Sequence, residues 1–391
     1  MNINISGWEG LTVSLVLAVL LIGFLSFWTL KRVIPPHWLL LSLIIKLGIP
    51  FVYFTVPVGN AWFLLDDITY YNQGVELLNA GYNPFTIFFN EAGMATLFRL
   101  SGGTHILYGW LNLFSMFILG PYYYSPVFFN IFLTCISGYF IYKISIFCGF
   151  ERRYSSALVC FFILHWDVLV WSSFLNLKDV VVLTMTVILF YALVLVQIRL
   201  NFTALITVAV VLFAFLWIRF YVPIMVLLAF GLYYLFVLNG IFRVKLGQLI
   251  VILIIGALIF FELGVNKIGI YFSMLDVSPS TIVTGAIRMI LTPQPWSIDP
   301  KYSFLLIPSI FHLFFIVPML VGGCVLWVRS KKARFFIIYF LISILLYASF
   351  DELQGPRHRV QLLMVIVWMQ FHFIWEFLKL VVEKKIPRLG G

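Results

Sequence analysis

Long apolar runs separated by short polar turns recur along almost the whole chain. Several runs approach the roughly 20 residues that a helix needs to cross about 30 Å of hydrocarbon. The runs are continuous, whereas the strands of a membrane barrel alternate apolar and polar positions. This pattern predicts an all-α polytopic membrane protein with about 11 transmembrane helices. The predicted spans are residues 8–30, 39–57, 126–145, 155–171, 180–197, 202–218, 222–238, 249–261, 304–327, 335–349 and 360–377.

Two longer segments interrupt this alternation of spans and turns. Residues 58–124 contain the turn residues Asn83-Pro84 and the apolar stretch Ile106–Leu119, which is short for a crossing. We predict an interfacial or re-entrant helix for this stretch, and a full crossing is the alternative. Residues 264–302 form the second long segment. Because no repeat, low-complexity tract or soluble domain is visible, we treat residues 1–391 as a single transmembrane domain.

The composition supports this interpretation and the charges orient the chain. The sequence is 63% hydrophobic and 10% charged, whereas a soluble domain is roughly half apolar. The net charge of +10 arises mostly from short Lys and Arg clusters between predicted spans, as the positive-inside rule describes. We therefore expect a multi-pass protein of the plasma membrane, the inner membrane of a bacterium, with its N-terminus outside and its C-terminus in the cytoplasm. Membrane lipids are expected partners, and nucleic acid is not.

The four cysteines do not predict a disulfide framework. Cys135 and Cys324 lie within predicted spans, and Cys148 and Cys160 flank a predicted cytoplasmic turn. None is spaced with histidine as in a zinc site. No cofactor and no metal site are predicted, although the sequence leaves room for a divalent metal ion.

Two adjacent carboxylates, Asp66 and Asp67, follow the second predicted span on the outer side. Charged side chains at a membrane edge can serve solvation, a salt bridge or chemistry on a substrate at the bilayer surface. These two aspartates could act as a catalytic base and an acceptor-orienting group. Alternatively, they could cap the N-terminus of the next helix and complement its dipole.

Basic residues that fall on the outer face are the exceptions to the positive-inside pattern. The strongest cluster is Gly355-Pro356-Arg357-His358-Arg359, which we interpret as a phosphate clamp because the guanidinium fork matches phosphate oxygens. The alternative is an anchor in which the arginines extend to lipid headgroups. Arg219 lies in a tight outer turn, where it would pair with a substrate phosphate or a protein carboxylate. Lys178, with Asp179, could bind substrate or cap the following helix.

Arg288 belongs to an amphipathic stretch that is followed by Pro293-Gln294-Pro295-Trp296. One interpretation is an interfacial helix broken by prolines, with Trp296 in the aromatic belt. The other is a lid over a lipid-phosphate pocket, in which Arg288 would bind substrate.

The outer motif Asp-Asp-x-x-Tyr, formed by Asp66, Asp67 and Tyr70, resembles that of the GT-C glycosyltransferases. These include protein O-mannosyltransferases and bacterial aminoarabinose transferases, and the later basic motifs are also similar to those of polysaccharide-polymerase-like relatives. The resemblance implies a GT-C-like fold with interfacial helices in the first outer loop. It further implies that Asp66 is the general base, that Asp67 positions the acceptor and that Tyr70 binds substrate. The motif follows the second span rather than the first, which departs from the family pattern.

The leading functional hypothesis is therefore a membrane glycosyltransferase. It would move a sugar from a polyprenyl-phosphate-linked donor to a glycan, lipid or protein acceptor at the outer face. The cations Lys178, Arg219, Arg288, Arg357 and Arg359, with His358, would bind the lipid phosphate. One alternative is a polysaccharide polymerase or ligase that uses polyprenyl-diphosphate-linked glycans. Another is a flippase for lipid-linked sugars, although the ionisable residues lie at span ends rather than at mid-membrane.

Overall fold

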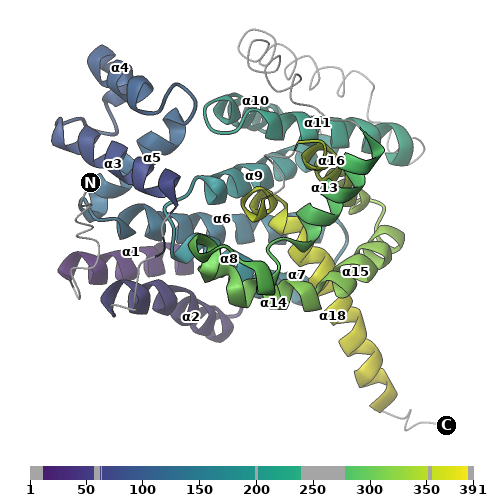
Figure 1. Ribbon diagram of the computed structural model, residues 1–391. Helices are drawn as coiled ribbons and strands as arrows, with labels where there is room; N and C mark the ends of the chain where they lie inside the picture. The colour runs from purple at the N-terminus through teal and green to yellow at the C-terminus, as the bar shows by residue number, and fades with distance from the viewer. Residues whose placement is uncertain are drawn as a thin grey trace.

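The computed structural model describes residues 12–56, 62, 64–198, 201–238, 278–350 and 355–385. Throughout these ranges the regular structure is helical, which confirms the predicted all-α fold class (Figure 1). Some predicted features lie outside the described residues, namely the start of the first span, the span at 249–261, the start of the first long segment and residues 264–277 of the second.

Within the described ranges, five helices are long and apolar enough to cross a membrane. They are α1 (Val13–Leu30), α2 (Pro36–Thr55), α6 (Tyr124–Phe147), α9 (Asp179–Ile198) and the C-terminal segment Pro356–Val381, which comprises α17 (Pro356–Arg359) and most of α18 (Leu363–Lys385). Two bent helix pairs raise the number to seven if each pair is one span. The chain is thus membrane-embedded and helical, as the sequence predicts.

The degree of burial places α9 at the centre and α1 at the edge of the bundle. In α9, 83% of the span is buried, compared with 28% in α1. α1 and α2 expose large apolar side chains such as Leu20, Phe24 and Ile44, which is expected of helices that face lipid. Figure 1 shows α9 and α6 in the middle of the molecule, with α1 and α2 beside them.

Two spans that the sequence pattern predicts as continuous are bent. Helices α7 (Arg152–Leu164) and α8 (Trp166–Ser173) meet at 48°, because His165 adopts an extended backbone and turns its ring toward Gln370. Helix α14 (Leu306–Phe314), with the 3-10 turn Pro300–Leu305 before it, meets α15 (Ile316–Arg329) at 52°. Pro318 explains the second bend, since proline lacks an N–H and its ring clashes with the carbonyl of the residue four positions earlier.

Several helices in predicted spans are shorter than a full crossing. They are α10 (Phe202–Leu216), α11 (Tyr221–Tyr233), which continues as a π-helical turn (Tyr234–Leu238), and α16 (Arg334–Ala348). The amphipathic stretch with Arg288 forms α13 (Pro279–Leu291), and a 3-10 turn (Pro295–Ser297) follows it.

The first long segment folds into three helices that group at one end of the molecule (Figure 1). They are α3 (Leu65–Asn79), α4 (Glu91–Leu100) and α5 (Ile106–Leu119), with a 3-10 turn (Ile87–Phe89) before α4. α3 and α5 pack closely at Gly74, where an added Cβ would lie 2.8 Å from the Met116 Sδ. The 14 residues of α5 are few for a membrane crossing.

The two ends of α6 differ in chemistry. The helix has 24 residues and is therefore about 36 Å long. Just before its start, Tyr123 donates a hydrogen bond to Asp67. Near its end lies Lys143, and Lys332 donates to the Phe147 carbonyl at 3.0 Å. We call the end of the bundle at Asp67 the site end and the end at Lys143 the basic end.

Helices α15 and α18 pack with their backbones in close contact at Gly322. A Cβ on this residue would lie 1.9 Å from the Met369 carbonyl oxygen, and a backbone atom cannot move aside as a side chain does. We expect Gly322→Ala to destabilise the fold by about 3 kcal/mol or more, at the upper end of overpacking costs. The measurement is the thermal unfolding midpoint in detergent. Gly231→Ala is the control, because no atom of the described residues outside its own helical turn lies within 4 Å of a Cβ there. Equal midpoints for the two variants would contradict the prediction.

Candidate functional site

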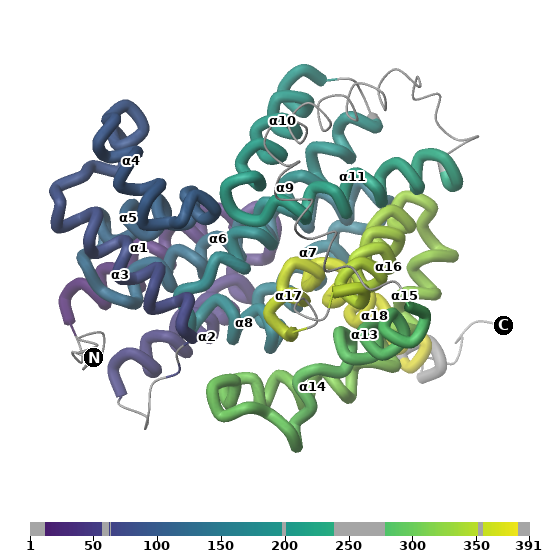
Figure 2. The backbone as a smooth tube through the Cα atoms, turned by 45° about the horizontal axis from the view of Figure 1, so that its top comes forward, coloured from purple at the N-terminus to yellow at the C-terminus, as the bar shows by residue number. Residues whose placement is uncertain are grey.

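Four charged side chains from different parts of the chain form a hydrogen-bonded cluster at the site end. At the start of the C-terminal segment, Arg357 donates from Nη1 to Asp66 Oδ2 at 2.5 Å and from Nε to Asp179 Oδ2 at 2.7 Å. From the turn between α10 and α11, Arg219 donates from Nη2 to Asp179 Oδ1 at 2.7 Å. We call Asp66, Asp179, Arg219 and Arg357 the arginine–carboxylate cluster. Figure 2 shows α17, which carries Arg357, in the middle of the molecule.

The solvent exposure of the four side chains decreases across the cluster, from Asp66 to Asp179. The side chain of Asp66 is 46% exposed and that of Arg357 is 17% exposed, whereas those of Arg219 and Asp179 are 5% and 1% exposed. Asp66 is therefore the member that an incoming molecule can reach. Asp179 is the buried anion that holds the two guanidinium groups in place.

Both arginines retain donors without partners. Arg357 Nη2 and Arg219 Nη1 are buried and have no hydrogen-bond acceptor among the described residues. Buried donors in folded proteins are nearly always satisfied, so these two atoms are free to donate to an acceptor that enters the site. Guanidinium groups bind phosphate and carboxylate oxygens through paired N–H donors. The cluster can accordingly bind an oxyanion between its two arginines.

Lys178 and His105 extend the site on the side of Tyr70. The Lys178 Nζ lies 2.7 Å from His105 Nε2 and 5.7 Å from the centre of the Tyr70 ring. Burial and the charges of Arg219 and Arg357 lower the pKa of Lys178 to about 7. Burial and Lys178 lower the pKa of His105 to about 4, so at neutral pH its imidazole is uncharged and can accept a hydrogen bond from the Lys178 amino group.

Asp66 and Asp67 have different roles, although they are adjacent in the chain. Asp67 is fully buried, and its Oδ1 accepts hydrogen bonds from the backbone N–H groups of Leu64 and Ile68 at 3.0 and 2.7 Å. Its Oδ2 accepts one from the Tyr123 hydroxyl at 2.6 Å. Asp67 thus caps α3 and ties it to the start of α6.

The pKa values and the accessibility of the two aspartates favour different candidates for a base. Burial raises the pKa of Asp67 to about 6, which suits a base. Partial burial also acts to raise the pKa of Asp66, but the hydrogen bond and charge of Arg357 hold it below its ordinary value. A base must reach the proton that it removes, so geometry takes precedence over pKa. Asp66 is the candidate base.

A buried amide network supports the loop that carries Lys178. Asn176 accepts a hydrogen bond from the Tyr108 hydroxyl at 2.6 Å and donates to Asn112 Oδ1 at 2.7 Å. Its backbone N–H donates to the Tyr123 hydroxyl at 3.2 Å, and Asn130 donates to the Leu177 carbonyl at 3.2 Å. The network fixes the start of α9 relative to α5 and α6.

The structure places Arg359 in a separate cluster. Its Nη1 donates to the Thr292 carbonyl at 2.7 Å, and its Nη2 lies 3.9 Å from Asp167 Oδ1. His312 Nδ1 lies 4.0 Å from Asp167 Oδ2, and its Nε2 donates to the Ile290 carbonyl at 2.7 Å. These side chains are almost fully buried. Arg359 therefore holds the segment after α13, and no described contact joins it to Asp66.

Of the remaining predicted residues, Arg288 is exposed on α13, and the His358 ring lies 5.7 Å from that of Tyr347. The described contacts thus bring together Asp66, Lys178, Arg219 and Arg357, with Tyr70 beside Lys178. The sequence analysis considered Asp179 only together with Lys178, as a substrate-binding or helix-capping pair, and it assigned no role to His105, Tyr123 or Asn176. For Asp179 a signal existed, because it is an acidic residue at the head of a strongly apolar span.

The described residues contain no group of three or more His, Cys, Asp or Glu side chains that could hold a metal ion. In the arginine–carboxylate cluster both carboxylates already accept hydrogen bonds from guanidinium groups. The positive charge beside these carboxylates therefore comes from the chain itself. The chain matches no protein-family model, and a search of curated proteins finds no match either.

Proposed function

We propose that this protein is a GT-C-type membrane glycosyltransferase with about 11 spans in a plasma membrane, the site end outside and the C-terminus in the cytoplasm. It takes a sugar from a polyprenyl-phosphate-linked donor and transfers it to a glycan, lipid or protein acceptor. The observation that carries this proposal is the half-exposed carboxylate of Asp66 beside two arginines, each of which has a buried nitrogen with no acceptor among the described residues. Base and anion site are thus adjacent at one end of a helical bundle.

In the proposed reaction the acceptor hydroxyl oxygen attacks the anomeric carbon of the sugar. The bond between that carbon and the phosphate oxygen breaks, and the electron pair leaves with the polyprenyl phosphate. Asp66 takes the hydroxyl proton, while Arg357 and Arg219 stabilise the charge that develops on the phosphate. The anomeric configuration inverts because the displacement is single and from the opposite face.

Arg357 couples the binding of donor to the activation of the base. Before donor binds, its guanidinium is hydrogen-bonded to Asp66 and lowers the pKa of that carboxyl. A donor phosphate competes for the same guanidinium. As this hydrogen bond weakens, Asp66 becomes more basic, so the base is strongest when the donor is in place.

The charge of the site favours a monophosphate-linked donor over a diphosphate-linked one. Two carboxylates and two guanidinium groups in the cluster cancel, and Lys178 adds at most one positive charge. A polyprenyl phosphosugar is a phosphodiester with one negative charge, whereas a diphosphate carries two. The polymerase or ligase alternative therefore fits this site less well.

The test is transfer from radiolabelled polyprenyl-phosphate and polyprenyl-diphosphate sugars in proteoliposomes, compared with liposomes that lack the protein. The proposal expects label to move from the monophosphate donor to an acceptor. Arg357→Gln should abolish this transfer, whereas Arg99→Gln, at an exposed pair with Glu76, should not. Movement of intact donor between leaflets without consumption would instead identify a flippase.

The pKa of Lys178 predicts how donor binding depends on pH. A group with a pKa of about 7 is ~90% charged at pH 6 and ~10% charged at pH 8. A charged ammonium favours an anionic donor, so KM for the donor should rise severalfold between pH 6 and pH 8. Lys178→Arg keeps its charge and should flatten this rise. A pH-dependent KM that persists in the arginine variant would assign the titration to another group.

A further inference from the structure

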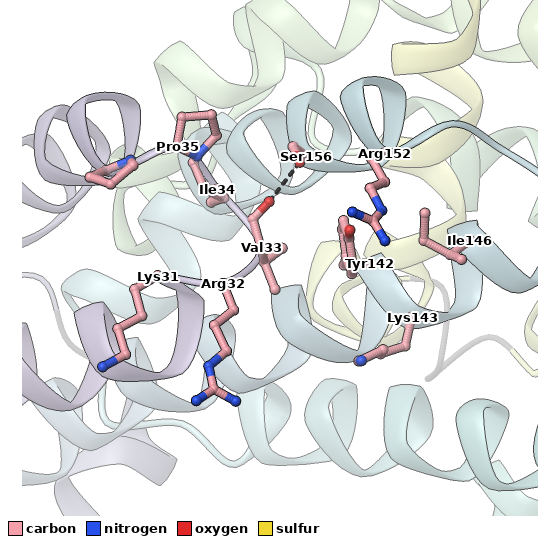
Figure 3. Close-up of a pocket in the computed structure, with 11 residues that line it drawn as sticks. Lys31, Arg32, Val33, Ile34, Pro35, Tyr142, Lys143, Ile146, Arg152 and Ser156 are labelled. Atoms are coloured by element: carbon pink, nitrogen blue, oxygen red, sulfur yellow. Dashed lines mark hydrogen bonds between the residues drawn. The ribbon is translucent and has the colours of Figure 1, made fainter.

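The basic end of the bundle contains an open pocket of about 580 Å³ (Figure 3). It forms where the α1–α2 loop meets the end of α6 and the start of α7. Four cations line it, two from the loop and one from each helix. They are Lys31, Arg32, Lys143 and Arg152. We call this the basic pocket.

The loop that forms one wall of the basic pocket is fixed in position. The Ser156 hydroxyl donates to the Val33 carbonyl at 2.6 Å, which attaches the loop to α7. The Lys31 Nζ lies 3.0 Å from the centre of the Trp28 ring, so this side chain is also held. The basic pocket is therefore built by contacts between elements rather than by isolated surface side chains.

The positive charge of the basic pocket has no carboxylate partner within the described part of the chain. None of its four cations forms an ion pair with a carboxylate among the described residues. Cations gathered in one concavity repel one another and attract an anion. Apart from Ser156 and Tyr142, the uncharged wall is apolar, and the Ser156 hydroxyl is already engaged. Such a wall offers little to the sugar or base of a nucleotide.

An apolar groove of about 610 Å³ adjoins the same helices. It lies between α1 and α2, and both the groove and the basic pocket are built on this helix pair and its loop. Phe27 of the groove is four residues from Lys31, and Leu40 is four residues from Pro36. Four helical residues correspond to about 6 Å, so the groove ends about one helical turn from the loop.

We propose that the basic pocket binds the phosphate of an anionic phospholipid, with an acyl chain in the groove between α1 and α2. The basic end corresponds to the cytoplasmic leaflet under the positive-inside rule, where lysines and arginines meet anionic headgroups. Four cations suit a lipid with two phosphates better than one with a single phosphate. The basic pocket lies at the opposite end of α6 from the arginine–carboxylate cluster, so this lipid is distinct from the sugar donor.

The test measures lipid binding to the full-length protein in detergent by native mass spectrometry. Cardiolipin and phosphatidylglycerol should bind, with cardiolipin tighter, and phosphatidylcholine should not. Lys143→Gln with Arg152→Gln should weaken cardiolipin binding about 10- to 30-fold, because each headgroup contact with Lys or Arg contributes at the membrane surface. The control is Arg153→Gln with Lys331→Gln, since both residues are exposed and outside the basic pocket. Equal weakening by the control pair would overturn the proposal.

A second variant separates a lipid from a free phosphate. Gly48 lines the groove, and among the described residues outside its own helical turn no atom lies within 4 Å of a Cβ placed there. The side chain of Gly48→Phe therefore starts in open space and should occupy part of the groove. It should weaken binding of long-chain phosphatidylglycerol while leaving any binding of soluble glycerol phosphate unchanged. If Gly48→Phe binds lipid as well as the wild-type protein does, the acyl chain does not lie in the groove between α1 and α2. Displacement of cardiolipin by millimolar inorganic phosphate would assign the basic pocket to a soluble anion instead.

Discussion

Replacement of Asp66 by Asn should lower the turnover of sugar transfer about 10²- to 10⁴-fold, the range by which a positioned base accelerates proton transfer. Asparagine has nearly the same shape but cannot take the acceptor proton. Arg357 keeps its second carboxylate, Asp179, and gains a free N–H for the donor phosphate. We therefore expect kcat to fall while KM for the donor stays the same or decreases. The measurement is initial rates in proteoliposomes over a range of donor concentrations.

The neighbouring aspartate provides the matched comparison. Asp67→Asn disturbs the capping of α3 and the hydrogen bond from Tyr123, so it should lower stability by about 1–3 kcal/mol. Asp66 is half exposed, and loss of an exposed ion pair costs at most about 1 kcal/mol. Asp66→Asn should thus be stable and inactive, and the folded fraction of Asp67→Asn should retain activity. The reverse pattern would make Asp67 the base and remove Asp66 from the proposed mechanism.

The residue pattern singled out the aspartate pair, but only the family resemblance assigned the two residues different roles, Asp66 as base and Asp67 as the group that positions the acceptor. Both residues lie in the first turn of α3, and both alternatives, capping and chemistry, were compatible with that position. In the structure the two aspartates differ in their contact with Tyr123, which is 56 residues away from Asp67 in sequence and hydrogen-bonds only that carboxylate of the two. Such a contact depends on how α3 and α6 pack, and no local pattern encodes it.

The basic motif near the C-terminus is a second case in which the local sequence pattern does not predict the contacts. Arg357 and Arg359 are two residues apart, and their similar chemistry predicted a shared phosphate clamp. Residues at this spacing on a helix point in different directions, and here Arg357 meets Asp66 while Arg359 meets Thr292. The all-helical fold was predictable because apolar runs are a local signal. The bend at Pro318 also had a local signal, whereas the bend at His165 had none, and the His165 ring contacts Gln370 across the bundle.

The buried carboxylate of Asp179 should matter more for folding than any other member of the site. It accepts hydrogen bonds from two arginines, and its side chain is 1% exposed. Asp179→Asn leaves two guanidinium charges without an anion between them. Removing one partner of a buried ion pair costs about 3–5 kcal/mol, and the effect here should reach the upper part of that range. The unfolding midpoint in detergent should fall clearly below that of Asp299→Asn, a variant at an exposed pair.

A double variant tests whether the loss arises from uncompensated charge. Adding Arg219→Gln to Asp179→Asn removes one of the two guanidinium groups that have lost their carboxylate partner. It leaves two neutral amide side chains at positions 179 and 219. The double variant should therefore be more stable than Asp179→Asn alone, a positive coupling that independent sites do not show. It should remain inactive, because Arg219 is then missing from the phosphate site. Additive losses would mean that Asp179 stabilises the start of α9 by packing alone, and the two arginines would then be held apart by other contacts.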